Sequence, residues 1–210
     1  MTDHPILYSF RRCPYAIRAR LAVASAGLTV ELREVLLRDK APEFLDTSPS
    51  ASVPCLKSGQ QVIDESFDIM LWALEQNDPE NLLAMPSAGH DLISDTDGPF
   101  KTALDRYKYH TRYEACDRNI ERSKASDHLT RLNVQLGDTI WLFGDDPRLA
   151  DFAILPFVRQ FAFVDKPWFD SQEWPNLHHW LEAFIDSDRF KQIMTKYPVW
   201  QADDLPTYFP

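Results

Sequence analysis

Up to about residue 83, short stretches with a strand-like hydrophobic pattern alternate with stretches of helical spacing. Residues 6–9 form an apolar run, and residues 29–34 alternate between polar and apolar side chains, so both are predicted strands. Between them, residues 14–26 carry apolar side chains three and four positions apart, which predicts a helix that ends at Gly27. Residues 40–46 form a shorter and weaker helical stretch.

Two more strands and a helix complete this region. Residues 54–57 and 61–64 are predicted strands on either side of a Ser58-Gly59-Gln60 hairpin turn. Residues 66–76 return to helical spacing. The predicted order is therefore β-α-β-α-β-β-α, an α/β domain over residues 1–83.

The strand signals disappear after residue 83. Residues 84–96 mix Pro, Ser, Gly and Asp, a composition typical of a linker and of the start of a new unit. Helical spacing then continues over residues 100–113, within 116–136, and over 149–163, 177–185 and 190–196. We therefore expect a second domain over residues 84–210 that is all-α, so that the fold class is α/β followed by all-α.

Composition narrows the classes of function. The 210 residues are 44% hydrophobic and 26% charged, as in ordinary soluble proteins, and the net charge of −10 argues against binding to nucleic acid or to an anionic membrane. No apolar run approaches the ~20 residues that a membrane span needs, and the amino terminus does not resemble a signal peptide. Three cysteines make no disulfide framework. These features predict a cytoplasmic protein.

The most informative residue is Cys13, in the run Tyr8-Ser-Phe-Arg-Arg-Cys-Pro-Tyr-Ala-Ile-Arg-Ala-Arg20. It stands where the first helix begins, directly before a proline that suits the first helical position and directly after two arginines. The positive end of the helix and the two guanidinium groups are expected to favour the thiolate, which is the nucleophile, with the sulfur accepting hydrogen bonds from the first turn. The alternative is an inert buried thiol, against which the arginines and the cap position count.

Two further motifs have both a structural and a functional interpretation. Val53-Pro54 opens a predicted strand, where the proline is either a simple edge residue or part of a cis bond that shapes the loop. Glu65-Ser66 lies between a strand and a helix, where it either only starts the helix or also places an anion at free backbone N–H groups. Taken singly, neither motif decides between its alternatives.

Together, the three motifs resemble those of the glutathione transferases: Cys13-Pro-Tyr-Ala at the first helix, Val53-Pro before the third strand, and Glu65-Ser before the last helix of the domain. The continuation Arg18-x-Arg20 resembles the cysteine-type members, which are the omega-class transferases and the two-domain glutaredoxin-like proteins of bacteria. The resemblance implies a thioredoxin-like first domain, a helical-bundle second domain, a homodimer, and glutathione as co-substrate without a metal.

The resemblance also implies roles around the sulfur of glutathione. Cys13 resembles the catalytic thiol that lies beside this sulfur, and Tyr15 occupies a position that lines the same site. Val53, which would precede a cis-proline at Pro54, resembles the residue whose backbone N–H and C=O pair with the cysteinyl part of glutathione.

The two ends of glutathione are assigned in the same way. Glu65 and Ser66 resemble the pair that holds the γ-glutamyl amine and carboxylate. Lys40 falls where omega-like members direct a lysine toward the glycyl carboxylate, and a solvated surface lysine is the alternative.

Several positions depart from the family pattern. Ala16 replaces the second cysteine of dithiol glutaredoxins, which predicts a monothiol site. Ser50-Ala51-Ser52 replaces a glycine-containing loop, and Arg148 stands where a Ser or Thr helix cap is usual three residues before Asp151, so Asp146-Pro147 is expected to open that helix instead. Cys55 is expected in a buried strand, with a disulfide to Cys13 as a weak alternative, and Cys116 on a helix face.

The implied activity is glutathione-dependent thiol transfer, or deglutathionylation, through a mixed disulfide between Cys13 and glutathione. Two alternatives remain open: a non-catalytic scaffold that binds glutathione or a protein, and a conventional transferase that conjugates electrophiles. The second substrate is expected to be small and either apolar or a disulfide. The six histidines show no metal-ligand spacing, and the sequence has no glycine-rich phosphate-binding loop.

Overall fold

The computed structural model describes residues 4–210, and the chain forms two compact units. Unit 1 contains the residues up to Asn81 together with Ser187–Pro210, and unit 2 is Leu82–Asp186. The carboxyl-terminal segment therefore belongs to unit 1 and not to the helical domain expected over residues 84–210. The reason is a short carboxyl-terminal strand that pairs with the sheet of unit 1, described below.

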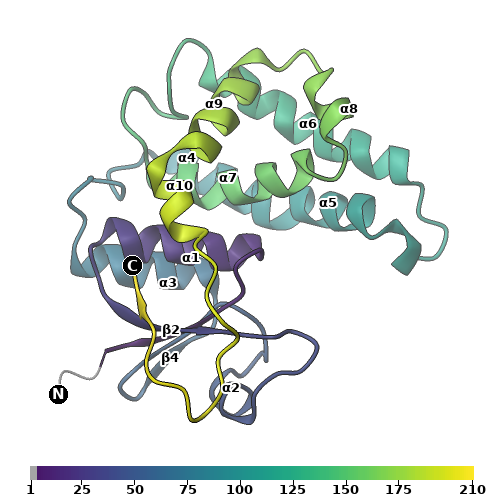
Figure 1. Cartoon of the computed structure of the whole chain (residues 1–210). Helices are drawn as coiled ribbons and strands as arrows, with labels where there is room; N and C mark the ends of the chain where they lie inside the picture. The colour runs from purple at the N-terminus through teal and green to yellow at the C-terminus, as the bar shows by residue number, and fades with distance from the viewer. Residues whose placement is uncertain (1–3) are drawn as a thin grey trace. The chain divides into compact units, whose positions relative to one another are not determined.

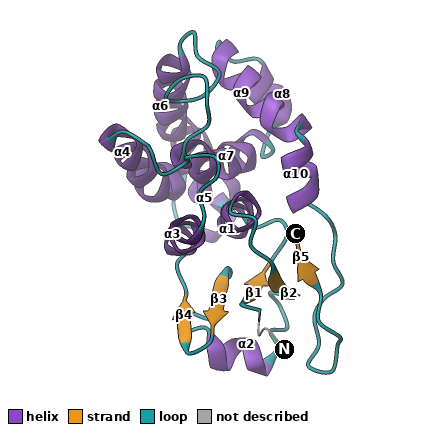
Figure 2. Cartoon of the chain, turned by 90° about the vertical axis from the view of Figure 1, so that its left-hand side faces the viewer, coloured by secondary structure: helices purple, strands orange, loops and turns teal. Residues whose placement is uncertain are grey.

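Unit 1 is built on a mixed five-stranded sheet with the order β4-β3-β1-β2-β5 (Figure 2). Its strands are β1 (Ile6–Ser9), β2 (Val30–Glu34), β3 (Cys55–Ser58), β4 (Gln61–Ile63) and β5 (Tyr208–Phe209). β1 and β2 are parallel, and the other neighbouring pairs are antiparallel. This arrangement confirms the predicted thioredoxin-like order of elements.

Helices cover both faces of this sheet. α1 (Pro14–Ser25) and α3 (Ser66–Gln76) pack on one face, and α2 (Pro42–Thr47) lies on the other, as Figures 1 and 2 show. α1 is buried on nearly all sides, including the side chains of Arg18 and Arg20. Because buried charged groups need partners, these two arginines must make specific hydrogen bonds inside the unit.

The carboxyl-terminal segment adds α10 (Asp188–Ile193) and β5 to unit 1. In β5, Phe209 pairs with Val30 of β2 and its side chain is fully buried. The backbone N–H of Leu32 donates to the carbonyl of Thr207 at 2.7 Å. This segment therefore covers the edge of β2, which would otherwise present unpaired backbone groups.

Unit 2 is helical. Its helices are α4 (Ser87–Asp95), the π-helical turn η1 (Thr96–Phe100), α5 (Lys101–Lys108), the 3₁₀ turn η2 (His110–Arg112), α6 (Arg118–Leu136), α7 (Leu149–Ala162), α8 (Lys166–Asp170) and α9 (Pro175–Asp186). A new unit does begin in this region, at Leu82, but residues 84–96 are not a linker, because α4 forms there. A Cβ atom at Gly89 would lie 2.3 Å from the Met85 sulfur, so this glycine allows close packing in the helix.

Asp151 organises the start of α7. Its carboxylate accepts hydrogen bonds from the backbone N–H groups of Leu142 (2.9 Å) and Arg148 (2.8 Å) and from the Trp180 indole (3.1 Å). The helix begins at Leu149, so the expected opening at Asp146-Pro147 is wrong. The carboxylate at the third helical position thus satisfies the backbone N–H of the cap residue Arg148, which is the reciprocal half of a capping box.

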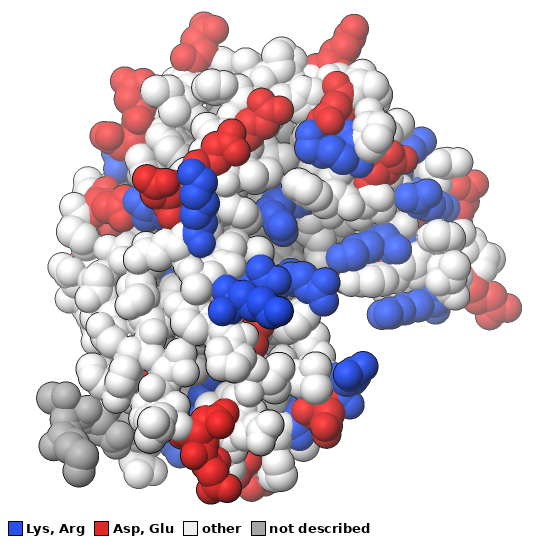
Figure 3. Space-filling model, in the orientation of Figure 1, with Lys and Arg blue, Asp and Glu red and all other residues white. Residues whose placement is uncertain are grey.

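Charged side chains of both signs are mixed over the face drawn in Figure 3. In unit 2, the exposed pair between Arg131 and Asp95, with nitrogen and oxygen 2.8 Å apart, contributes little to stability because solvent screens both charges. Within residues 4–210, no helix is both long and apolar enough to span a bilayer.

Candidate active site

Cys13 lies at the cap position of α1, where the sequence predicted it. Pro14 follows it as the first residue of the helix. The Cys13 backbone is extended, and its N–H donates to the carbonyl of Phe10 at 2.9 Å. The side chain is half-buried and packs against a buried cluster made of Tyr8, Val35, Phe44, Val53 and Cys55. The sulfur is therefore held by packing while part of the residue stays accessible.

The contact of the sulfur differs from the expected one. The Cys13 Sγ donates toward the carbonyl oxygen of Val53 at 3.7 Å, and within the described residues its side chain makes no capping hydrogen bond to the start of α1. The expectation that the sulfur accepts from the first turn is thus wrong for this state. A carbonyl acceptor favours the protonated thiol, whereas the amino end of α1 favours the thiolate.

Val53 and Pro54 are buried, and the peptide bond between them is cis. The loop that leads to them is held by the carboxylate of Asp64, which accepts from the Ser48 hydroxyl and from the Ser50 N–H, each at 2.7 Å. Burial acts to raise the pKa of Asp64, but these donors outweigh it and hold the pKa below its ordinary value. Asp64 is a loop-holding residue that the sequence analysis missed.

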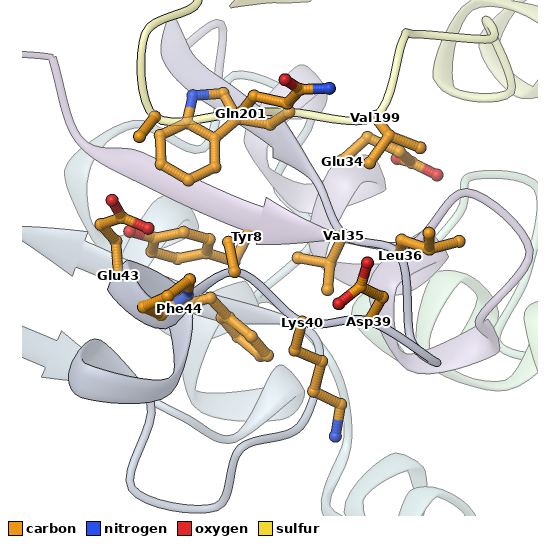
Figure 4. A pocket seen from close by; sticks show the side chains of 14 residues that line it. Tyr8, Glu34, Val35, Leu36, Asp39, Lys40, Glu43, Phe44, Val199 and Gln201 are labelled. Carbon is orange, nitrogen blue, oxygen red and sulfur yellow. The ribbon is translucent and has the colours of Figure 1, made fainter.

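Lys40 is half-buried, and its ammonium donates to the carbonyl of Ala51 at 2.9 Å. Ala51 has a φ of 52°, the left-handed region that favours glycine, which explains why the family loop contains one. Lys40 also borders a pocket of about 380 Å³ in unit 1, lined further by Tyr8, Phe44 and Trp200. Figure 4 shows its side chain directed away from this pocket.

Glu65 and Ser66 stand at the start of α3, as predicted. Glu65 is exposed at the cap position, whereas Ser66 is buried and its hydroxyl accepts from the Arg18 Nε at 2.9 Å. The Arg18 guanidinium lies 5.2 Å from the ring centre of Tyr15 and 6.0 Å from that of Phe67. Because the oxygen of Ser66 accepts from a cation, its O–H remains available to donate to an anion.

The structure thus links the candidate residues in two groups. Cys13 contacts Val53, and Lys40 contacts the loop just before it. Ser66 and Tyr15 are joined through Arg18. In the sequence, Arg18 stands out only as part of the Arg18-x-Arg20 motif, and nothing there indicates that it links Ser66 with Tyr15.

The other two cysteines take no part in these groups. Cys55 is buried, and burial together with the nearby Asp64 carboxylate raises its pKa to about 12, so it stays a neutral thiol. Cys116 lies in the loop before α6 and not on a helix face. All three cysteines are free, so the disulfide alternative between Cys13 and Cys55 is wrong for this structure. Across residues 4–210, no cluster of three or more His, Cys, Asp or Glu side chains could hold a metal ion.

Comparison with known proteins gives the family. Residues 7–82 match the family described as glutathione S-transferase, N-terminal domain, and residues 102–183 match the corresponding C-terminal domain. The chain is 25% identical to glutathione S-transferase U22 of Arabidopsis thaliana over 79% of its length and 78% of that protein. It is 24% identical to maleylacetoacetate isomerase of Pseudomonas aeruginosa, covering 94% of this chain and 97% of the isomerase.

The fold has a solved counterpart. A glutathione transferase family member from Pseudomonas fluorescens, crystallised with two glutathione bound, superposes with a TM-score of 0.79 at 20% identity, covering 91% of this chain and 92% of that one. Glutathione is the co-substrate of this family. With an amino-terminal and a carboxyl-terminal family domain matched in order along it, the chain belongs to the glutathione S-transferase superfamily.

Proposed function

We propose that this protein is a cysteine-type member of the superfamily that catalyses glutathione-dependent thiol transfer. The observation that carries the proposal is the place of Cys13: a half-buried free thiol at the amino end of α1, beside the carbonyl of Val53. A thiol at this position forms a disulfide with glutathione, whereas the conjugation of electrophiles needs a hydroxyl that activates glutathione itself. Within the superfamily, Cys13 therefore favours exchange over conjugation.

The reaction has two thiol–disulfide exchange steps. The Cys13 thiolate attacks the glutathionyl sulfur of a mixed disulfide R–S–S–G; an S–S bond forms between Cys13 and glutathione, and the S–S bond between the sulfur of R and that of glutathione breaks. The released R–S⁻ takes a proton from water. A glutathione thiolate then attacks the glutathionyl sulfur on Cys13, which releases glutathione disulfide and restores the Cys13 thiolate. Such exchange is fastest when the pKa of the attacking thiol lies near ambient pH.

The contact between Cys13 and Val53 gives substrate binding a part in this chemistry. In the proposed complex, the cysteinyl N–H of glutathione donates to the Val53 carbonyl, the same atom to which the Cys13 thiol donates in the free protein. Occupation of that carbonyl removes the acceptor that favours the protonated thiol. The positive end of the helix, which favours the thiolate, then has more weight at Cys13.

The remaining candidate residues bind the two ends of the tripeptide. Ser66 donates its hydroxyl to the γ-glutamyl carboxylate, with the cation of Arg18 behind it. Glu65, exposed at the start of α3, pairs with the γ-glutamyl amine. Lys40 pairs with the glycyl carboxylate after it leaves the carbonyl of Ala51, and Tyr15 lines the sulfur site.

We extend the proposal to a homodimer, as the family resemblance implies, and to the cytoplasm, as the composition indicates. The proposed second substrate is a small apolar molecule or a disulfide. The first test is glutathione-dependent reduction of a β-hydroxyethyl disulfide by wild type, Cys13→Ser and the matched control Cys116→Ser. We expect Cys13→Ser to abolish turnover and Cys116→Ser to retain it. Undiminished turnover by Cys13→Ser would remove Cys13 from the mechanism.

Two further measurements separate the alternatives. Retention on immobilised glutathione without any disulfide exchange would favour a non-catalytic scaffold. Conjugation of chlorodinitrobenzene that persists in Cys13→Ala would favour a conventional transferase.

A further inference from the structure

The second arginine of the Arg18-x-Arg20 motif lies at the centre of a buried polar network. The Arg20 side chain is fully buried, and its Nη2 lies 2.5 Å from Oε2 of Glu34, at the end of β2. Its Nε donates to the hydroxyl of Ser9 at 2.8 Å, and its Nη1 donates to the carbonyl of Ile193 at 3.1 Å. The guanidinium therefore joins the ends of β1 and β2 to α10.

The second carboxylate oxygen of Glu34 reaches the loop that carries Cys13. Its Oε1 accepts from the backbone N–H of Arg11 at 2.7 Å. On either side of this bond, the Val35 N–H donates to the carbonyl of Ser9 at 2.7 Å, and the Cys13 N–H donates to the carbonyl of Phe10 at 2.9 Å. Glu34 thus supplies a side-chain anchor for the backbone in the middle of the loop between β1 and α1, where the Arg11 guanidinium also donates to the carbonyl of Met194 at 3.4 Å.

We propose that Glu34 is a positioning residue for the thiol reaction: through the Arg11 N–H it holds the loop that places Cys13 at the start of α1, and Arg20 holds the Glu34 carboxylate in place. The proposal rests on the proposed function, since it concerns the geometry of the same thiol. Glu34 acts through the loop and is not itself a catalytic residue.

The physical basis is the cost of leaving a partly buried backbone N–H without an acceptor. Without the Glu34 carboxylate, the Arg11 N–H is satisfied only if the loop moves toward water or toward another acceptor. Such a movement displaces Cys13 from the helix start and from the glutathione sulfur with which it reacts in the proposed function. A misplacement of about 1 Å is enough to slow a reaction roughly 100-fold.

Single variants do not test this cleanly, because removing either partner leaves a buried charge and endangers the fold. We therefore compare two double variants, Arg20→Met/Glu34→Gln and Arg20→Met/Glu34→Leu. Both remove the ion pair and the contacts of Arg20 with Ser9 and Ile193. They differ in one respect: glutamine keeps a carbonyl oxygen that can accept from the Arg11 N–H, and leucine does not.

Two measurements are made on each double variant, after thermal unfolding has verified that both are folded. The rate of hydrogen exchange in the peptide that contains residues 9–13 shows whether the Arg11 N–H stays hydrogen-bonded, and this measurement requires no enzymatic activity. The kcat and KM for disulfide reduction report its consequence. We expect the leucine variant to exchange faster in this peptide and to have a kcat roughly 10- to 100-fold below that of the glutamine variant, with a similar KM for glutathione.

The outcomes are distinguishable. Equal kcat in the two double variants, with or without a difference in exchange, overturns the positioning role. If wild type itself has no disulfide reductase activity, the proposed function fails, and with it the catalytic meaning of the anchor. If only one double variant folds, Glu34→Gln and Glu34→Leu are compared in an Arg20→Gln background, which also leaves no buried charge, by the same two measurements.

Discussion

Unit 2 contains two buried ionisable groups whose pKa values are shifted in opposite directions, and this makes a sharp prediction about stability in acid. Burial, and then the nearby guanidinium of Arg131, lower the pKa of His128 to about 4. Burial raises the pKa of Asp151 to about 6, although its hydrogen bonds oppose the shift. Each group should leave its own signature in the pH dependence of unfolding.

The contacts of His128 explain why its neutral form is preferred. Its Nδ1 lies 3.2 Å from the Arg131 guanidinium, which has no acceptor atoms, so Nδ1 must accept and Nε2 must carry the proton. The Nε2–H then donates to the Thr96 hydroxyl at 3.0 Å, and that hydroxyl donates to the carbonyl of Leu92 at 2.7 Å. Protonation of Nδ1 would place an N–H against a cation.

The signs follow from comparing folded and unfolded chains. The unfolded chain protonates His128 near its ordinary pKa of 6.5 and the folded chain only near 4, so stability falls as the pH falls through this window. A shift of this size corresponds to about 3 kcal/mol. For Asp151 the folded chain binds the proton first, near 6, so stability rises as the pH falls from about 6 to about 4, again by about 3 kcal/mol.

In wild type the two contributions largely cancel between about pH 6 and pH 4. We expect His128→Gln to become more stable on acidification relative to wild type, and Asp151→Asn to lose stability more steeply. Urea unfolding followed by tryptophan fluorescence at several pH values measures both slopes, and His179→Gln, at an exposed position, is the matched control. If all four proteins share one pH dependence, the buried groups do not titrate as argued.

Three other outcomes are expected. Phe209→Ala removes the buried side chain of β5 and should lower the free energy of unfolding by about 3–5 kcal/mol, whereas Leu205→Ala, at an exposed position, should leave it unchanged in the same urea titration. At about pH 8, iodoacetamide should label Cys13 and spare Cys55, whose pKa is raised to about 12; peptide mass spectrometry decides, and labelling of Cys55 in the native protein would contradict its burial. Ser66→Ala should weaken glutathione binding about 10-fold by calorimetry, since a hydrogen bond to a charged group is lost, and an unchanged affinity would remove Ser66 from the binding site.

The fold of unit 1 could be predicted because its elements follow hydrophobic periodicity closely. β2 is the clearest case, since its residues alternate strictly between buried and half-buried positions. β5 could not be predicted in this way, because two residues are too few for any pattern. Its contribution comes from one buried aromatic side chain and from pairing with the distant β2. The composition of residues 84–96 predicted a linker for another reason. Gly89 lies inside α4, where it leaves room for the side chain of Met85, and it does not end a helix.

The candidate site was predicted from local motifs. These motifs do not include the residues that hold the site loops in place. Glu34 is an instance in which the signal was present. It occupies the same inward register of β2 as Val30 and Leu32, and a carboxylate at a buried strand position demands a buried partner. Arg20 is likewise buried on α1, three residues after Ile17 of its apolar face. Only the tertiary structure brings the two together.

A common principle connects the two loops that carry the candidate site. The loop to Cys13 is anchored on the carboxylate of Glu34, and the loop to Val53 is anchored on the carboxylate of Asp64. In both cases one carboxylate oxygen accepts from a backbone N–H of the loop and the other from a side chain, that of Arg20 or of Ser48. A short loop without regular structure has few internal hydrogen bonds, so an acceptor fixed on a strand or at its end is an effective way to define its course. The thiol and the carbonyl to which it donates thus each lie beside a loop that a carboxylate on a strand or at its end holds at a backbone N–H.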